Sequence, residues 1–325
     1  MDKSIGDLQK MQGSVAAYIA IARLDHSTKH IFIVPGMILA YLLRGVHAPS
    51  LVSSITFGLL AAICIASSNY VINEWFDREF DKFHPTKSER AAVKTQLSGT
   101  IIFLEWAGLV AVGLACAFAA SKLTLLVASV FALQGIIYNV PPIRSKDKAY
   151  LDVISEAINN PLRLIIGWAM IDPTTLPPGS IMLTYWAGGA FLMAAKRLSE
   201  FREIVASHGR ELLERYRASF ANYSEISLTV SCFVYALATS FFLAIFLIKY
   251  RVEYLLVVPV LIALFGHYLA LSMEPASTAQ RPEKLFEERA LIALVALLAA
   301  TFLFATYVNI PALDGLAGQR YISLE

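Results

Sequence analysis

Residues 51–81 read LVSSITFGLLAAICIASSNYVINEWFDREFD, and this stretch decides how the rest of the chain is interpreted. Residues 51–72 form an apolar run of the length that a membrane-spanning helix needs, roughly 20 residues. Asn73, Asp77 and Asp81 then recur at every fourth position, so on a helix they share one face. Oxygen ligands on one face suit Mg²⁺, and the basic residues that follow in 82–90 suit phosphate. The stretch predicts a site for a divalent cation and phosphate at the end of a membrane helix.

The composition predicts an integral membrane protein. The chain is 57% hydrophobic and 16% charged, whereas soluble domains are about 25% charged. The net charge of +2 is too small to indicate nucleic-acid binding. The cysteines Cys64, Cys116 and Cys232 lie far apart inside apolar runs, so they indicate small buried side chains rather than a disulfide framework or a metal site.

Nine apolar runs predict an all-α fold with nine transmembrane helices, organised as a single domain over residues 1–325. Lys and Arg concentrate in alternate connections between these runs, which places the charged loops and the amino terminus in the cytoplasm. Three connections are long and highly charged, 73–100, 141–152 and 196–225. We therefore expect cytoplasmic cap loops at 73–100 and 196–225 and an active site that faces the cytoplasm. The predicted spans are 31–43, 51–72, 101–120, 123–140, 153–171, 181–195, 226–248, 254–273 and 290–308.

Polar residues inside the predicted spans mark a functional surface. Asn69 continues the four-residue spacing of Asn73 and Asp77 into the bilayer. In the fifth span Asp152, Glu156, Asn159 and Arg163 share one helical face, and a proline interrupts the helix between them. Polar groups at this depth are costly and usually functional. They favour a cavity wall, and the alternative is a structural ion pair between Arg163 and a neighbouring carboxylate.

Several cationic residues near the ends of the predicted helices suit phosphate binding. Arginine binds phosphate as a two-pronged donor and lysine as a point charge. The alternative for any one of them is ordinary anchoring of a cytoplasmic helix end. Glu200 follows two of these residues by one helical turn and adds a carboxylate to the same face. The candidates are Lys29, Lys87, Arg144, Lys146, Lys196 and Arg197.

These motifs together resemble the UbiA superfamily of intramembrane prenyltransferases. The family motif NDxxDxxxD appears here with Glu74 in place of its first Asp, and the segment 138–146 is also similar to the family. The resemblance covers about residues 23–308. It implies nine helices around a central cavity open to the cytoplasmic face, with Mg²⁺ as cofactor. It also implies that Asn73, Asp77 and Asp81 are catalytic and that these three residues and Glu74 bind the metal.

The second acidic motif of the superfamily is replaced here. Most members have DxxxD after the sixth helix, whereas this chain has Lys196, Arg197 and Glu200. This pattern is similar to the branch of decaprenyl-phosphate phosphoribosyltransferases, although Glu89-Arg90-Ala91 lacks a proline that is usual there. The resemblance implies substrate-binding roles for Lys29, Asn69, Lys87, Arg144, Lys146, Arg163, Lys196, Arg197 and Glu200.

Three functions remain open from the sequence. The first is transfer of 5-phosphoribose from phosphoribosyl pyrophosphate to a polyprenyl phosphate. The second is transfer of a prenyl group from a prenyl diphosphate to an aromatic or other small acceptor. The third is a non-enzymatic transporter or lipid-binding membrane protein. In the first two, the partners are a polyprenyl lipid, a phosphorylated donor and the surrounding membrane lipid. The oligomeric state stays open.

Overall fold

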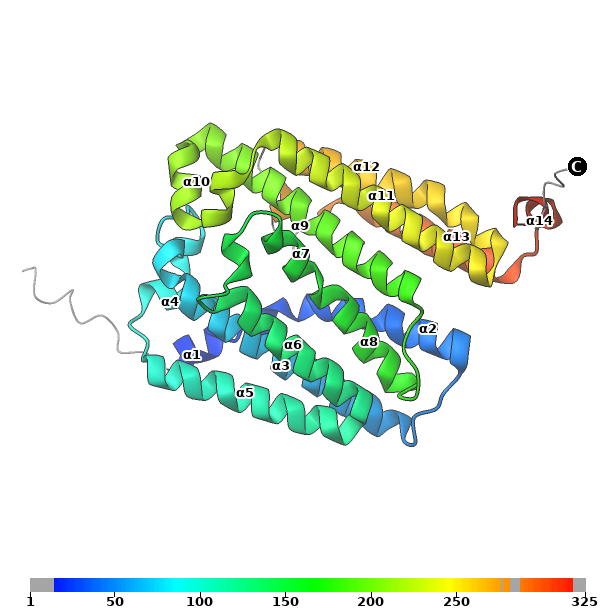
Figure 1. Ribbon diagram of the computed structural model, residues 1–325, viewed down its shortest axis with the longest axis horizontal. Helices are drawn as coiled ribbons and strands as arrows, with labels where there is room; N and C mark the ends of the chain where they lie inside the picture. Colours follow the sequence, from blue (N-terminus) through cyan, green and yellow to red (C-terminus); the bar gives the residue numbers. More distant parts are fainter. Residues whose placement is uncertain (1–14, 276, 281–286, 318–325) are drawn as a thin grey trace, which may run out of the picture. The chain divides into compact units, whose positions relative to one another are not determined.

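The computed structural model describes residues 15–275, 277–280 and 287–317, and the regular elements among these residues are all helices (Figure 1). Within these described ranges, six helices are long and apolar enough to cross a membrane, in agreement with the predicted all-α membrane fold. The chain forms two compact units. The amino-terminal unit is Met1–Pro177 with Ile204–Ser224, and the carboxy-terminal unit is Pro178–Glu203 with Glu225–Glu325.

The amino-terminal unit is built around α3, which packs against α5, α6 and α8. Small residues such as Ala61, Ala62 and Ala128 are fully buried in its core, as expected where membrane helices approach closely. Its elements are α1 (Val15–Ile21), η2 (Leu24–Ile33), α2 (Val34–Arg44), α3 (Leu51–Asp81), η3 (Lys87–Glu89), α4 (Ala91–Lys94), α5 (Gly99–Ala120), α6 (Lys122–Asn139), η4 (Ser145–Asp147), α7 (Leu151–Ala157), α8 (Asn159–Ile171), α10 (Arg210–Tyr216) and η5 (Ala218–Asn222).

The carboxy-terminal unit contains a packed group of apolar helices in which α12 contacts both α11 and α13. The aromatic ring of Phe191 packs edge-on against Phe265, which joins α9 to α12 inside this unit. Its elements are most of α9 (Gly179–His208), then α11 (Glu225–Tyr250), η6 (Val252–Leu256), α12 (Val257–Met273), η7 (Thr278–Gln280), α13 (Arg289–Tyr307) and α14 (Pro311–Ala317).

Six of the nine predicted spans coincide with the candidate membrane helices, namely α3, α5, α6, α11, η6 with α12, and α13. The first predicted span consists of η2 followed by the short α2, and the sixth lies within the longer α9. The fifth is divided at Ile158 into α7 and α8. Pro161 has no N–H to donate to the carbonyl of Ala157, and the side-chain amide of Asn160 donates to that carbonyl instead at 3.4 Å. The count of nine stays a prediction.

Two glycines bring α8 into backbone contact with the start of the chain. A Cβ atom on Gly36 would lie 2.1 Å from the carbonyl oxygen of Leu164, and one on Gly167 would lie 2.0 Å from that of Ile33. Neither distance leaves room for a side chain, so both positions require glycine. Helix α8 is therefore fixed against η2 and α2 on one side and packs on α3 and α6 on the other.

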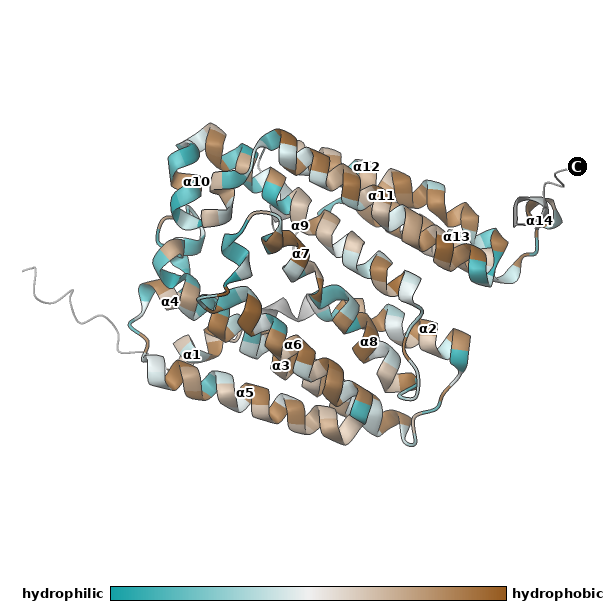
Figure 2. Ribbon diagram, viewed as in Figure 1, coloured by the Kyte–Doolittle hydropathy of each residue, from teal (hydrophilic) through white to brown (hydrophobic). Residues whose placement is uncertain are grey.

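The two segments that we expected to be cap loops are largely helical. Helix α3 continues to Asp81, and α9 continues to His208 before Gly209 ends it with a φ of 82°. No proline or glycine follows the apolar windows at once, so the charged residues extend each helix beyond them. In the amino-terminal unit, hydrophilic residues gather around α4, α10 and the connection from α6 to α7 (Figure 2). The assignment of the chain to a single UbiA-like domain stays a prediction.

Candidate active site

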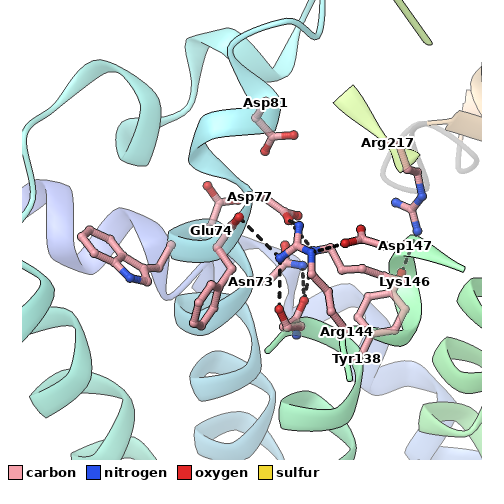
Figure 3. A network of polar contacts seen from close by, with 12 residues as sticks. Asn73, Glu74, Asp77, Asp81, Tyr138, Arg144, Lys146, Asp147 and Arg217 are labelled. Carbon is pink, nitrogen blue, oxygen red and sulfur yellow. Dashed lines mark hydrogen bonds and ion pairs between the residues drawn. The ribbon is translucent and has the colours of Figure 1, made fainter. Parts of the chain in front are cut away.

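The site is organised on the last turns of α3. Because α3 is helical to Asp81, the side chains of Asn73, Asp77 and Asp81 project from one face, as their spacing predicts (Figure 3). Asp81 is 4% exposed, and Asp77 is also mostly shielded, with a side chain that is 15% exposed. The helix thus presents two carboxylates, one turn apart, in a largely desolvated setting where charges interact strongly.

Two cations from the connection between α6 and α7 hold Asp77. The Lys146 Nζ lies 2.5 Å from Asp77 Oδ1, and the Arg144 guanidinium donates to the same oxygen at 2.9 Å (Figure 3). Arg144 also donates to Asp147 Oδ2 at 2.7 Å and to the backbone carbonyl of Asn139 at 3.0 Å. Arg144 and Lys146 are both buried. The end of α6 therefore delivers two fixed positive charges to the carboxylates of α3.

Two asparagines, Asn73 on α3 and Asn139 on α6, connect these helices next to the charged residues. The side-chain amide of Asn73 donates to Asn139 Oδ1 at 2.6 Å, and Lys146 donates to the same oxygen at 3.1 Å. Asn139 in turn donates to the backbone carbonyl of Gly135 at 2.9 Å. This chain of bonds fixes the position of Lys146 relative to α3, so Asn73 contributes through Asn139 as well as through its own oxygen.

Burial lowers the pKa of Lys146 from its ordinary value of 10.5 to about 8, although the charge of Asp77 acts to raise it. Desolvation disfavours the charged ammonium more than the partner carboxylate favours it. Such a lysine gains strongly from additional negative charge, which is what a diphosphate brings. Lys146 is therefore held in a position and an environment that favour anion binding.

Glu74 and Asp81 are engaged by arginines. Arg90 lies 3.1 Å from Glu74 Oε1 and 2.7 Å from Asp81 Oδ2, and Arg23 lies 3.4 Å from the same oxygen of Glu74. Glu74 is 4% exposed, so two arginines share one buried carboxylate. Asp77, in contrast, is held by the cations from the α6–α7 connection. The four predicted metal ligands therefore fall into two sets with different partners.

Lys87 lies above an aromatic ring from the cap. Its Nζ is 5.2 Å from the centre of the Tyr216 ring, within cation–π range. The preceding turn is organised by His84, whose Nδ1 accepts from the backbone N–H groups of Thr86 and Lys87 at 3.2 and 3.3 Å. The ring of His84 also packs edge-on against Tyr216. The turn after α3 and helix α10 are thus joined through the residues around Lys87.

Arg217 belongs to the same network, although the sequence marked it only as one of many cytoplasmic cations. Its guanidinium donates to the hydroxyl of Tyr138 at 3.0 Å (Figure 3). It also donates to Asp152 Oδ2 at 3.4 Å. Asp152 is fully buried and also accepts from the hydroxyls of Ser219 and Tyr223 at 3.2 and 2.7 Å. The sequence offered one signal for such a partner, namely Asp152 at the start of the fifth predicted span. A carboxylate that is buried there needs hydrogen-bond donors from another part of the chain.

The remaining predicted residues include one on α3, one in η2 and three in the carboxy-terminal unit. The side-chain amide of Asn69 donates to the carbonyl of Phe131 at 3.1 Å, and Asn69 precedes Asp77 by about 12 Å along the helix axis. Lys29 lies in η2, and its side chain is outside the described residues. In the carboxy-terminal unit, Arg197 donates to Glu200 Oε2 at 2.8 Å, and both side chains are buried; Lys196 belongs to the same unit.

The family is decided by a match over most of the chain. A family model described as the UbiA prenyltransferase family matches residues 31–287. The chain belongs to this family. Together with its six apolar helices, family membership identifies an integral membrane protein. The resemblance drawn from the motifs is confirmed at the level of the family.

Solved structures share the fold at low sequence identity. A UbiA homolog from Archaeoglobus fulgidus bound to DMAPP and Mg²⁺ is 18% identical, with a TM-score of 0.66, over 90% of this chain and 100% of that one. The same homolog bound to GPP and Mg²⁺ is 20% identical with a TM-score of 0.65 over the same shares. A structure of digeranylgeranylglyceryl phosphate synthase is 14% identical with a TM-score of 0.60, over 90% of this chain and 99% of that one.

A relative in sequence is the uncharacterized protein y4nM of Sinorhizobium fredii, which is 31% identical over 153 residues. The matched region is 47% of this chain and 28% of that protein. The chain therefore spans less than a third of the length of this relative.

The donor set on α3 fits a magnesium ion that is shared with a substrate. Among the described residues no three His, Cys, Asp or Glu side chains converge as a complete metal cage. However, Asp77 and Asp81 are engaged through Oδ1 and Oδ2 respectively, and the other oxygen of each has no partner in the described part of the chain. Mg²⁺ binds through one or two carboxylates plus substrate phosphates and water rather than in an all-protein cage. Two such oxygens one turn apart suit that arrangement.

Proposed function

We propose that this member of the UbiA family is a Mg²⁺-dependent enzyme that transfers 5-phosphoribose from phosphoribosyl pyrophosphate to a polyprenyl phosphate. The observation that supports it best is the position of Asp77, which lies between Lys146 and Arg144 and one turn from Asp81. Carboxylates for a metal and cations for phosphate oxygens meet at one point, which suits a diphosphate leaving group.

In the proposed reaction, the bond between C1 of the ribose and the diphosphate oxygen breaks, and its electron pair leaves with the diphosphate. An oxygen of the lipid phosphate forms the new bond to C1. Lys146 and Arg144 donate hydrogen bonds to the leaving oxygens, and Arg90 neutralises Asp81 in the absence of substrate. Asp77 and Asp81, with the side-chain oxygen of Asn73, are the residues that would hold Mg²⁺. When bound, Mg²⁺ neutralises the negative charge that develops on the diphosphate.

The preference for a phosphorylated acceptor rests on the cationic character of the site. An aromatic or alcohol acceptor needs a base that removes its proton, whereas a lipid phosphate is already a nucleophilic anion and needs cations that hold it. In the amino-terminal unit, Arg90, Arg144 and Lys146 are such cations at the carboxylates of α3. Prenyl transfer from a prenyl diphosphate is the second candidate, because the related UbiA homolog binds DMAPP and GPP together with Mg²⁺.

The test compares two pairs of substrates with the purified full-length protein in lipid nanodiscs. One reaction contains phosphoribosyl pyrophosphate and polyprenyl phosphate, and the other contains a prenyl diphosphate and an aromatic acid, each with and without Mg²⁺. The proposal expects a phosphoribosylated lipid in the first reaction alone, and only with Mg²⁺. A product in the second reaction alone would replace it with prenyl transfer. No Mg²⁺-dependent turnover in either would favour a transporter or a lipid-binding protein.

We also propose that the site faces the cytoplasm, because the basic residues of the α3 end lie in one of the connections that the charge distribution assigns to that side. Glu89 is suitable for a test because its side chain is 70% exposed. In intact cells, a Glu89→Cys variant should resist a membrane-impermeant maleimide and should react once the membrane is opened. Reaction in intact cells would place the site on the opposite face.

A further inference from the structure

A second polar cluster lies inside the amino-terminal unit, separate from the carboxylates at the end of α3. Arg163 on α8 is 7% exposed, and its guanidinium lies 5.2 Å from the centre of the Phe131 ring on α6. It donates to the backbone carbonyl of Asn159, one turn earlier, at 3.4 Å. Asn69 on α3 donates to the carbonyl of the same Phe131. Three helices thus bring Arg163 and Asn69 to Phe131, and Asn159 lies one helical turn before Arg163.

Arg163 has no carboxylate within ion-pair distance among the described residues, and its buried Nε has no hydrogen-bond partner there. Glu156 lies on the same face of the broken helix and contributes electrostatically, but its Oε2 accepts from the Asn159 amide at 3.2 Å. The predicted alternative of a structural ion pair between Arg163 and a neighbouring carboxylate is therefore absent from the described part of the chain.

The two asparagines of the cluster also have unpaired acceptors. The Oδ1 atoms of Asn69 and Asn159 are buried and have no hydrogen-bond partner among the described residues. A buried cation without a counter-ion is costly, and so is each buried polar atom without a partner. The cluster therefore lacks both an anion for Arg163 and donors for two amide oxygens. Asn159 retains partial exposure, so the edge of the cluster is accessible.

A phosphate monoester supplies both missing features, whereas a carboxylate supplies one. Its charged oxygens accept hydrogen bonds from a guanidinium, ideally in pairs. In its singly charged form it also carries an O–H group, which can donate to an amide oxygen. An ionised carboxylate is an acceptor only. The combination of an arginine donor with asparagine acceptors thus favours the head group of a phosphorylated lipid.

The position of the cluster suits the acceptor rather than the donor. Asn69 lies about 12 Å from Asp77 along α3, deeper in the apolar part of the helix. Lys146 and Arg144 hold Asp77 at the outer end of the helix, where the diphosphate of the donor is proposed to bind. The deeper cluster is therefore left for the other substrate, the acceptor.

We propose that Arg163, with Asn159 and Asn69, forms a second anion site that binds the phosphate of the lipid acceptor. This inference rests on the proposed function, since it assigns the acceptor of the same reaction. It makes Arg163 a specificity-determining residue that distinguishes a polyprenyl phosphate from a polyprenol.

The test measures binding of a polyprenyl phosphate and of the polyprenol of equal length to the full-length protein in nanodiscs. Each titration is run without donor, and again with Mg²⁺ and inorganic diphosphate. The wild type should bind the phosphate at least about 10-fold more tightly than the alcohol, and Arg163→Gln should lose most of this preference. Arg289→Gln, which changes an exposed arginine at the start of α13, should retain it.

Asn159→Asp gives a second variant. It places a carboxylate one turn before Arg163, where the two side chains can pair, but it also replaces the hydrogen bond from Asn159 to Glu156 Oε2 with a contact between two carboxylates. We expect loss of the phosphate preference without a gain in melting temperature, while the binding of the polyprenol is retained. Because polyprenol binding reports that the protein is folded, this variant keeps the test decisive if Arg163→Gln does not fold.

Two outcomes would overturn the inference: an unchanged phosphate preference in Arg163→Gln, or an Asn159→Asp variant that still binds the phosphate as the wild type does. An Arg163-dependent preference for an aromatic carboxylate over the lipid phosphate would also overturn the assignment to phosphate. Because these titrations require no turnover, they are independent of the assay for phosphoribosyl transfer. A failure of the proposed reaction with an intact Arg163-dependent phosphate preference would therefore refute the donor and leave the anion site standing.

Discussion

Replacement of Lys146 by methionine should separate stability from activity. Methionine keeps most of the length and volume of lysine but removes the ammonium group that lies 2.5 Å from Asp77 and 3.1 Å from Asn139. Two energetic effects of opposite sign follow. Their balance can be worked out from the surroundings of Lys146.

Burial is the larger effect. The pKa of Lys146 is lowered from 10.5 to about 8, and this net shift already includes the opposing attraction of Asp77. It corresponds to roughly 3 kcal/mol against the charged form at about 1.4 kcal/mol per pKa unit. Asp77 keeps its bond from Arg144 at 2.9 Å, so it does not become an unpaired buried charge. The free energy of unfolding should therefore not fall in Lys146→Met, and its rise should not exceed about 3 kcal/mol.

The rate of the reaction should fall, because no other group replaces the ammonium of Lys146. Removal of one fixed donor to a leaving group typically costs about 10²–10³ in kcat. The assay is Mg²⁺-dependent release of diphosphate in nanodiscs, together with thermal unfolding of the same sample. Lys82→Met serves as the control, because Lys82 is exposed and pairs only with Glu79 at 2.6 Å in the described structure. A Lys146→Met enzyme with a kcat within about fivefold of wild type would refute a role for Lys146 in diphosphate binding.

Further predictions concern pH, metal binding and stability. Lys146 is charged below a pKa of about 8, so kcat/KM should fall as the pH rises through 8, and Lys146→Arg should move this fall upward. Glu74→Gln should leave the Mg²⁺ affinity within about twofold of wild type, because Glu74 lies about 100° around α3 from Asn73 and is held by two arginines. Asp81→Asn, on the face shared with Asn73 and Asp77, should weaken it about 10-fold, worth about 1.4 kcal/mol. Asp172→Asn should lower the free energy of unfolding by about 1–3 kcal/mol at pH 7 without changing activity.

The stability prediction for Asp172 has a definite pH dependence. Burial acts to raise the pKa of Asp172, but hydrogen bonds from Thr174, Thr175 and Arg44 outweigh it and hold the pKa well below the ordinary 3.8. A carboxyl with a lowered folded-state pKa contributes its full stability above pH 3.8 and loses it as the pH falls through the folded value. Urea unfolding at pH 7 and below pH 3.8 should therefore show the wild type approaching Asp172→Asn in acid. An equal difference in the free energy of unfolding between wild type and Asp172→Asn at both pH values would contradict the stabilising role of the ionised Asp172.

The metal and pH predictions have equally clear opposite outcomes. Equal weakening of Mg²⁺ binding by Glu74→Gln and Asp81→Asn would restore Glu74 as a metal ligand. A pH profile that is identical in wild type and Lys146→Arg would assign the fall above pH 8 to another group.

Local features of the site could be predicted from the sequence. Helix α3 is continuous because no glycine or proline interrupts residues 59–81, and the spacing of Asn73, Asp77 and Asp81 then places them on one face. The stop after α6 also followed from Pro141 and Pro142, since a residue before proline avoids helical geometry. These inferences depend only on neighbours within a few residues.

Features that depend on contacts between distant segments could not be derived in the same way. The partners of Glu74 come from residues 51 positions earlier and 16 positions later, Arg23 and Arg90, and no periodicity identifies such pairs. Arg217 was one cation among many until its bonds to Tyr138 and Asp152 were seen. The unpaired state of Arg163 likewise required knowledge of every carboxylate around it.

The most direct test of the central claim is the amount of diphosphate released per phosphoribosylated lipid formed, measured for wild type, Asp77→Asn and Glu79→Gln. Asp77 is held by Lys146 and Arg144, whereas the Glu79 side chain on the same helix is 59% exposed and pairs with Lys82. The account predicts equal amounts of both products in wild type and Glu79→Gln, with neither formed by a folded Asp77→Asn enzyme or after chelation of Mg²⁺. Product formation at the wild-type rate by Asp77→Asn would contradict it.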